Sequence, residues 1–215
     1  MKLHFRPGSP GSPGAPTASR ALLAFAAALV AIAIAGAACS PGPTSTPNET
    51  PIAAAPSAWP SGTTGQYGLH IDPSLLGRLP RTVGAYPLVE DTAGEMGALD
   101  DADLARTFDR YAAAATGVIG VDDNSLQLVV GHFRPESQNA DVQTAWISDY
   151  ATGACSQANG ISGTNQSTIN GWVVDVATCA GGPIVYSLSL GNATILSMYG
   201  LGQKDLGRML IEALY

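Results

Sequence analysis

An unbroken apolar segment near the N-terminus most constrains how this chain can fold. Residues 21–38 are 18 consecutive residues without a polar side chain. They follow a stretch that contains Lys2, Arg6 and Arg20 but no acidic residue, and Cys39 comes directly after them. A basic stretch, an apolar stretch and a run of small residues are typical of an export signal. We therefore expect residues 1–38 to direct export and to take no part in a folded core.

The end of this segment, Ala35-Gly36-Ala37-Ala38-Cys39, resembles the lipobox of bacterial lipoproteins. In that family small residues precede a cysteine that receives a lipid and becomes the new N-terminus, and an aliphatic residue usually stands at the position of Gly36. The resemblance covers only about the first 40 residues. It implies a lipid anchor at Cys39, on the extracytoplasmic face of the cell membrane. Cleavage near Ala37 or Ala38 without lipid, giving a secreted protein, and an uncleaved single-pass anchor are the alternatives.

The composition changes again after the cysteine. Residues 40–66 are mostly Pro, Ser, Thr, Gly and Ala with almost no charge, which is typical of a linker that cannot form a core. The predicted organisation is a signal peptide at 1–38, a lipidated cysteine and tether at 39–66, and one extracytoplasmic domain at 67–215. About 150 residues are enough for a single domain with its own core.

Charge excludes one class of partner. Without residues 1–38 the chain keeps 7 Lys and Arg against 17 Asp and Glu, a net charge of -10 compared with -7 for the whole sequence. Nucleic-acid binding requires clustered basic residues, so we expect no nucleic-acid partner. Anionic lipid headgroups would repel such a domain, so we expect membrane association through the lipid anchor alone.

The three cysteines divide in a way that agrees with this location. If Cys39 carries lipid, Cys155 and Cys179 remain as an even pair in an oxidising compartment. Their disulfide would stabilise the domain by about 3 kcal/mol through loop closure. The alternative is two buried free thiols.

Apolar periodicity predicts an α+β domain. Helices are expected from Asp72-Pro73 to Pro80 and over about 100–117, 140–151 and 203–214, and strands over about 85–90, 125–134, 172–177, 184–190 and 193–199. Cys155 is expected in a loop rich in Gly, Ser and Asn. Two hairpins and a closing amphipathic helix favour an antiparallel sheet of about four to five strands with helices packed on one face.

Only two histidines, His70 and His132, lie outside residues 1–38. A Ser-His-Asp triad would have to use one of them, and the sequence contains no Gly-x-Ser-x-Gly nucleophile motif. We therefore predict no catalytic residue. A secreted hydrolase with an unrecognised site around His132 or the acidic clusters is kept as an alternative.

No cofactor or metal is predicted either. The acidic residues cluster as Asp100, Asp101 and Asp103, at an expected helix start, and as Asp122 and Asp123 before Asn124, at an expected turn. Capping and turn roles explain both clusters better than calcium, since neither has the spacing of an EF-hand loop. Phosphate-binding glycine motifs are also missing from the sequence.

The expected function is a membrane-anchored, non-catalytic binding or interaction module, with an envelope protein or an apolar ligand as the candidate partner and its identity left open. The main alternative is a carrier of an apolar envelope ligand held between the sheet and its helices. Trp59, Trp146 and Trp172 could line such a cleft, although the apolar phase of Trp146 and Trp172 favours core positions.

Overall fold

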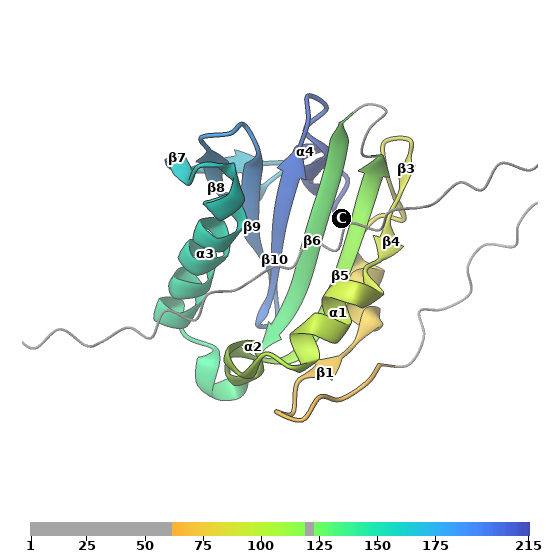
Figure 1. The fold of residues 1–215 in the computed structure, drawn as a ribbon, viewed down its shortest axis with the longest axis vertical. Coiled ribbons are helices and arrows are strands. Elements are labelled where there is room, and N and C mark those ends of the chain that lie inside the picture. Colours follow the sequence, from red (N-terminus) through yellow and green to blue (C-terminus); the bar gives the residue numbers. More distant parts are fainter. Residues whose placement is uncertain (1–61, 119–122) are drawn as a thin grey trace, which may run out of the picture. The chain divides into compact units, whose positions relative to one another are not determined.

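The computed structural model describes residues 62–118 and 123–215 as a sheet with helices around it (Figure 1). The strands are β1 (His70–Ile71), β2 (Thr82–Val83), β3 (Tyr86–Pro87), β4 (Val89–Glu90), β5 (Phe108–Val118), β6 (Asn124–Phe133), β7 (Ile161–Ile169), β8 (Trp172–Cys179), β9 (Ile184–Gly191) and β10 (Thr194–Leu201). The α-helices are α1 (Thr92–Leu99), α2 (Ala102–Thr107), α3 (Ala140–Cys155) and α4 (Leu206–Glu212), and the 3₁₀ helices are η1 (Pro73–Arg78), η2 (Pro135–Ser137) and η3 (Ser156–Ala158).

The main sheet has eight strands, more than the four to five predicted. Its order is β1-β5-β6-β10-β9-β8-β7, and β4 also pairs with β5. The β1–β5 pair is parallel and every other pair is antiparallel, so the sheet is mixed. A separate two-stranded ladder joins β2 to β3. The α+β class is therefore confirmed, with a wider sheet.

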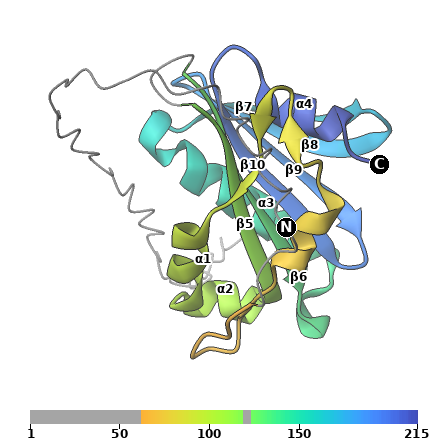
Figure 2. The same ribbon diagram turned by 90° about the vertical axis from the view of Figure 1, so that its right-hand side faces the viewer.

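Helices pack on both faces of the sheet, and the prediction of one covered face is wrong. Successive residues of a strand point to opposite faces. Along β10, Leu196 joins a core with residues of η1 and α4, whereas Ile195 joins a second core with residues of α3. Figure 2 shows α4 on one side of the sheet and α3 on the other. The closing helix has an apolar stripe that would fit either face, so its sequence could not specify which one.

The long helix predicted near 100–117 is a short helix followed by a strand. Helix α2 ends at Thr107, and β5 continues to Val118. Helical spacing of apolar residues misled the prediction because Ala112, Ala113 and Ala114 are all buried, two facing one core and one facing the other. A strand buried on both faces has no alternation of apolar and polar residues.

The loop expected after Cys155 is also wrong. Cys155 is the last residue of α3, and most of the expected loop is strand β7. The strands expected at 125–134, 172–177, 184–190 and 193–199 correspond to β6, β8, β9 and β10. The strand expected at 85–90 is divided between β3 and β4, and the last helix is shorter than predicted.

Candidate functional site

Cys155 and Cys179 form a disulfide. Cys155 and Cys179 are 0% and 1% exposed, and their bond joins the end of α3 to the end of β8. The predicted pairing is therefore present, and it fits an extracytoplasmic protein. The predicted lipidation residue, Cys39, lies outside the described residues. Among the described helices, none is long and apolar enough to span a bilayer.

One edge of the sheet is closed by neighbouring segments. β5 pairs at one end with β1, through His70–Ile71, and at the other with β4, through Val89–Glu90. Between these contacts Asp72 N–H donates to the Tyr111 carbonyl (2.8 Å) and Asp91 N–H donates to the Ala113 carbonyl (2.9 Å). The backbone along β5 is therefore used by other parts of the domain.

A buried carboxyl completes this closed edge. Glu95, in α1, is 2% exposed, and its Oε1 accepts a hydrogen bond from Ala113 N–H (3.0 Å). Burial raises the pKa of Glu95 to about 7, and nearby Glu90 and Asp91 add to this effect, while the Ala113 hydrogen bond opposes it. Glu95 thus satisfies a strand amide that neither β1 nor β4 reaches.

The opposite edge is open. β7 pairs with β8 on one side, and no other described strand pairs with it. Seven of its nine residues are exposed, the exceptions being Ser167 and Ile169, and none is charged or proline. Figure 1 shows β7 at the margin of the domain. Exposed edge strands normally carry lysine, proline, a bulge or a cover that prevents further pairing. The register of β7 with β8 shifts between Ile161 and Gly163, so the part of the strand from Thr164 onward is the part available for pairing.

The register identifies which backbone groups of β7 are free. Ala180 N–H donates to the Gly160 carbonyl (2.9 Å), and a two-residue turn at Asn170-Gly171 pairs Ile169 with Trp172. Backbone groups alternate between the two sides of a strand. The N–H and C=O groups of Thr164, Gln166 and Thr168 therefore point away from β8. These outward groups form the free edge of β7.

A second group of polar residues crosses the opposite half of the sheet. The register places His70 beside Arg110, Arg110 beside His132, and His132 beside Thr194. Residues directly opposite one another lie on the same face of a sheet. Two histidines far apart in sequence are thus brought into one row on either side of an arginine, which the separate sequence contexts did not predict.

Two carboxylates contact this row. His132 Nδ1 lies 2.7 Å from Asp109 Oδ1, and Arg110 Nη1 lies 3.3 Å from Asp72 Oδ2. Partial burial opposes ionisation of Asp72, but hydrogen bonds from Ser74 and Arg110 outweigh it and lower the pKa of this carboxyl. The Asp72 carboxylate also caps η1. The row can orient a histidine, but within the described residues no hydroxyl or thiol is hydrogen-bonded to His132 as a nucleophile would be.

The acidic cluster at 100–103 has the capping role predicted for it. Asp101 Oδ1 accepts hydrogen bonds from Asp103 N–H (2.8 Å) and Leu104 N–H (3.0 Å) at the start of α2, and Asp100 ends α1. Asp122 lies outside the described residues. Asp123 has φ 50°, as in a turn, and the side chain of Asn124 accepts a hydrogen bond from Lys204 N–H (2.8 Å). Over 62–118 and 123–215, no group of three or more His, Cys, Asp or Glu could hold a metal ion.

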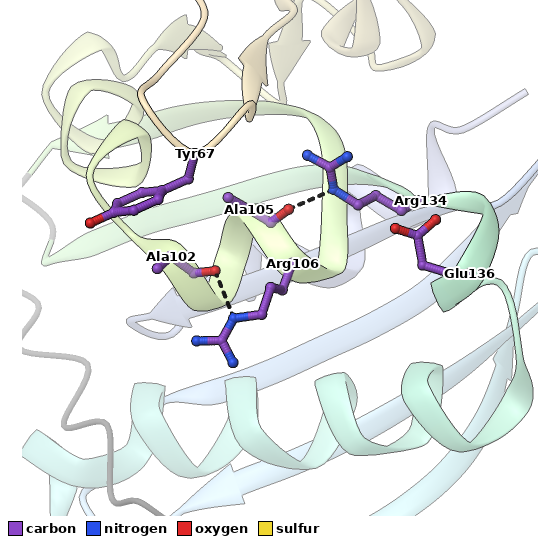
Figure 3. A pocket seen from close by; sticks show the side chains of 6 residues that line it. All are labelled: Tyr67, Ala102, Ala105, Arg106, Arg134 and Glu136. Atoms are coloured by element: carbon purple, nitrogen blue, oxygen red, sulfur yellow. Dashed lines mark hydrogen bonds between the residues drawn. The ribbon is translucent and has the colours of Figure 1, made fainter.

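A pocket of about 340 Å³ lies beside α2 (Figure 3). Its lining residues are Tyr67, Ala102, Ala105, Arg106, Arg134 and Glu136. Both guanidinium groups already bind backbone carbonyls, Arg106 Nε that of Ala102 (3.3 Å) and Arg134 Nε that of Ala105 (2.6 Å). An apolar ligand would meet mainly polar side chains here, so this pocket gives no support to a carrier function.

Two tryptophans belong to the cores, as their spacing predicted. The Trp146 ring packs edge-on against Phe108, with ring centres 4.7 Å apart, and its Nε1 donates to Ser197 Oγ (3.0 Å). Trp172 is half-buried against the core on the other face. Trp59 lies outside the described residues.

Comparison with known proteins finds no matching family model, no matching curated protein and no matching solved structure. The open edge is the feature that sequence reasoning missed. One signal could have revealed it, because Asn-Gly, here Asn170-Gly171, is a strong two-residue hairpin signal and directly precedes the Trp172 strand. A hairpin turn requires a strand on each side, so this signal predicts a strand directly before Asn170.

Proposed function

We propose that this protein is a membrane-tethered interaction module that binds an extended protein segment along the free edge of β7. In this proposal residues 1–38 direct export, a lipid on Cys39 anchors the chain, and residues 40–66 hold the domain away from the membrane. The function is binding without catalysis.

The open edge of β7 carries the proposal. An extended segment that aligns beside β7 would meet the free N–H and C=O groups of Thr164, Gln166 and Thr168. Such strand addition derives its affinity from main-chain hydrogen bonds, and neighbouring side chains add selectivity. No charged side chain of β7 would oppose an arriving strand. The opposite edge offers no comparable row, because β1, β4 and Glu95 occupy it.

The disulfide supports this use of the edge. It joins Cys179, at the end of β8, to the end of α3, and β8 is the strand on which β7 is held. A binding edge must keep its geometry before the partner arrives, since ordering it during binding would reduce affinity.

Site-specific photo-crosslinking of the full chain in its membrane tests the proposal. A photoreactive residue at Gln166 is expected to form a covalent protein adduct. The same residue at Met96, which is 61% exposed on α1 beside the closed edge, serves as the matched control and should form none. Absence of an adduct at position 166, or equal adducts at both positions, would contradict a binding role for β7.

The anchor has its own test. Cys39→Ala removes the lipid acceptor and should move the protein from the membrane fraction to the soluble fraction. The double variant Cys155→Ala/Cys179→Ala is the control for general loss of cysteine and should stay in the membrane fraction. Retention of the Cys39→Ala protein in the membrane would contradict lipidation.

A hydrolase is the second candidate, and the 2.7 Å contact between His132 and Asp109 is the observation that favours it. A carboxylate that orients a histidine is one part of a nucleophilic site, although the hydroxyl or thiol is still required. Turnover of ester or amide substrates by the wild-type chain, lost in both His132→Ala and Asp109→Asn, would establish this function. Turnover that persists in both variants would place any activity elsewhere.

A further inference from the structure

We propose that the segment bound by β7 is β7 of a second copy of this chain, so that two domains form one continuous antiparallel sheet. This inference rests on the proposed function, because it names the partner of the same edge. Three features of the strand support it: its symmetry in sequence, the direction of its free backbone groups and its lack of charge.

The sequence of β7 reads nearly the same in both directions by residue class. It is Ile-Ser-Gly-Thr-Asn-Gln-Ser-Thr-Ile, with Asn165 at the centre and isoleucine at both ends. A two-fold axis at Asn165 would place Thr164 opposite the second copy's Gln166. It would also place Gly163 opposite Ser167 and Ser162 opposite Thr168. A two-fold interface requires one surface to complement itself, and this strand meets that condition from Gly163 to Ser167; between Gly163 and Ile161 its register with β8 shifts.

The backbone agrees with an axis at this residue. In a pair of antiparallel strands, the N–H and C=O groups that point toward the partner must lie opposite one another. An axis that passes through a residue keeps Thr164, Gln166 and Thr168 opposite outward-pointing residues of the second copy. An axis between two residues would place outward groups opposite inward ones. Among the axes that pass through a residue, Asn165 allows the longest overlap.

Repulsion between the acidic surfaces of two copies favours a contact at the uncharged strand β7. The exported chain has a net charge of -10, so two copies repel each other over most of their surfaces. β7 has no charged residue, and Asp175 on β8 accepts a hydrogen bond from Gln166 Nε2 (3.2 Å). A shared membrane anchor would raise the local concentration of both copies and favour pairing. Salt, which screens the repulsion, should also favour it.

Cysteine crosslinking of the full chain, with its N-terminal segment intact and in mild detergent, tests the register. Asn165→Cys would place the two new thiols directly opposite, with Cα atoms about 4.5 Å apart, within the range of a disulfide. Thr168→Cys adds the same thiol three residues along the strand, where the two copies lie about 20 Å apart. The expected result is a covalent dimer for Asn165→Cys, seen without reductant and lost with it, and a monomer for Thr168→Cys.

Equal yields of dimer from the two variants, or no dimer from either, would overturn the self-pairing. Both variants retain Cys39, Cys155 and Cys179, so a crosslink through any of these would appear in both. The photo-crosslink at Gln166 separates the two proposals. An adduct with a different protein would overturn self-pairing and leave the interaction module in place, whereas no adduct at all would overturn both.

Discussion

The two edges of the sheet contrast in how their backbone groups are satisfied. At the β5 edge, β1, β4, two loop amides and the Glu95 carboxyl divide the strand among them. At the β7 edge, the strand has nine residues with neither charge nor proline, and seven of them are exposed. The same sheet thus ends once in a sealed strand and once in an open one.

The difference shows that the open edge is not a general property of this domain. Closing the β5 edge requires burial of a carboxyl whose pKa rises to about 7. Burial of an ionisable group costs free energy unless the group accepts a hydrogen bond from a backbone donor, as Glu95 does. The chain therefore closes the β5 edge with short strands and a buried carboxyl, and no described strand covers the β7 edge.

The largest expected effect comes from proline at the closed edge. Ala113→Pro removes the N–H that donates a hydrogen bond to Glu95, and it places the proline ring against the buried Glu95 side chain. We expect the free energy of unfolding to fall by about 4 kcal/mol, from the lost hydrogen bond and from overpacking. Urea unfolding followed by circular dichroism measures it. The matched variant is Gln166→Pro, which removes an outward N–H from the open edge, and equal losses would refute the contrast.

Removal of the disulfide should have the next largest effect. Cys155→Ala/Cys179→Ala opens a covalent loop with a sequence separation of 24 residues. We expect a loss of about 3 kcal/mol, measured by the same denaturation experiment. Reductant should lower the unfolding midpoint of the wild type and leave that of the double variant unchanged. A wild-type midpoint that does not respond to reductant would contradict a stabilising bridge.

The buried carboxyl predicts a smaller effect that depends on pH. The pKa of Glu95 is about 7 in the folded state, above its ordinary value of 4.5, so folding binds this proton more tightly. Its contribution to stability is present below about pH 4.5 and is lost as pH rises through about 7. Glu95→Gln keeps an acceptor for Ala113 N–H and cannot ionise. We expect it to raise stability by about 2–3 kcal/mol at pH 8 and by less than about 1 kcal/mol at pH 5.

Thermal unfolding of the wild type and Glu95→Gln at pH 5, 6, 7 and 8 checks this prediction. The control is Glu136→Gln, because Glu136 is an exposed carboxyl away from this edge. If the stabilities of the wild type and Glu95→Gln, each plotted against pH, stay parallel from pH 5 to pH 8, Glu95 does not titrate in this range.

The smallest effect on stability is expected at the open edge. Gln166→Pro removes an N–H that points to solvent, so we expect a loss below about 1 kcal/mol. The same variant should abolish the crosslink through Asn165→Cys, because it blocks a central hydrogen bond of the paired edge. A stable variant that still crosslinks would show that the contact does not use this backbone.

The same contrast explains what could be predicted from the sequence. β6, β8, β9 and β10 are central strands, and their apolar residues, such as Leu128 and Leu188, indicated them correctly. Helix α3 was found from the spacing of Trp146 and Tyr150. The sequence patterns did not indicate the two edge regions, β5 and β7. They failed at these two strands for opposite physical reasons.

At β5 the signal failed because Ala112, Ala113 and Ala114 are buried on both faces and so do not alternate. At β7 it failed because almost every side chain is exposed, leaving a polar sequence that is typical of a loop. Of the site, only the cysteine pair was predicted. The row of His70, Arg110 and His132 depends on the parallel pairing of β1 with β5, and no local pattern specifies such a long-range contact.

The disulfide also restricts how copies of this chain can exchange parts. The whole β7–β8 hairpin up to Thr178 lies inside the loop closed by Cys155 and Cys179. Domain swapping requires a hairpin to leave its own sheet and insert into another. Here the hairpin is held at both ends by one covalent bond, so it cannot be handed over as a free arm. The disulfide therefore restricts exchange of this hairpin, whereas the proposed side-by-side addition at β7 would form and dissociate without unfolding.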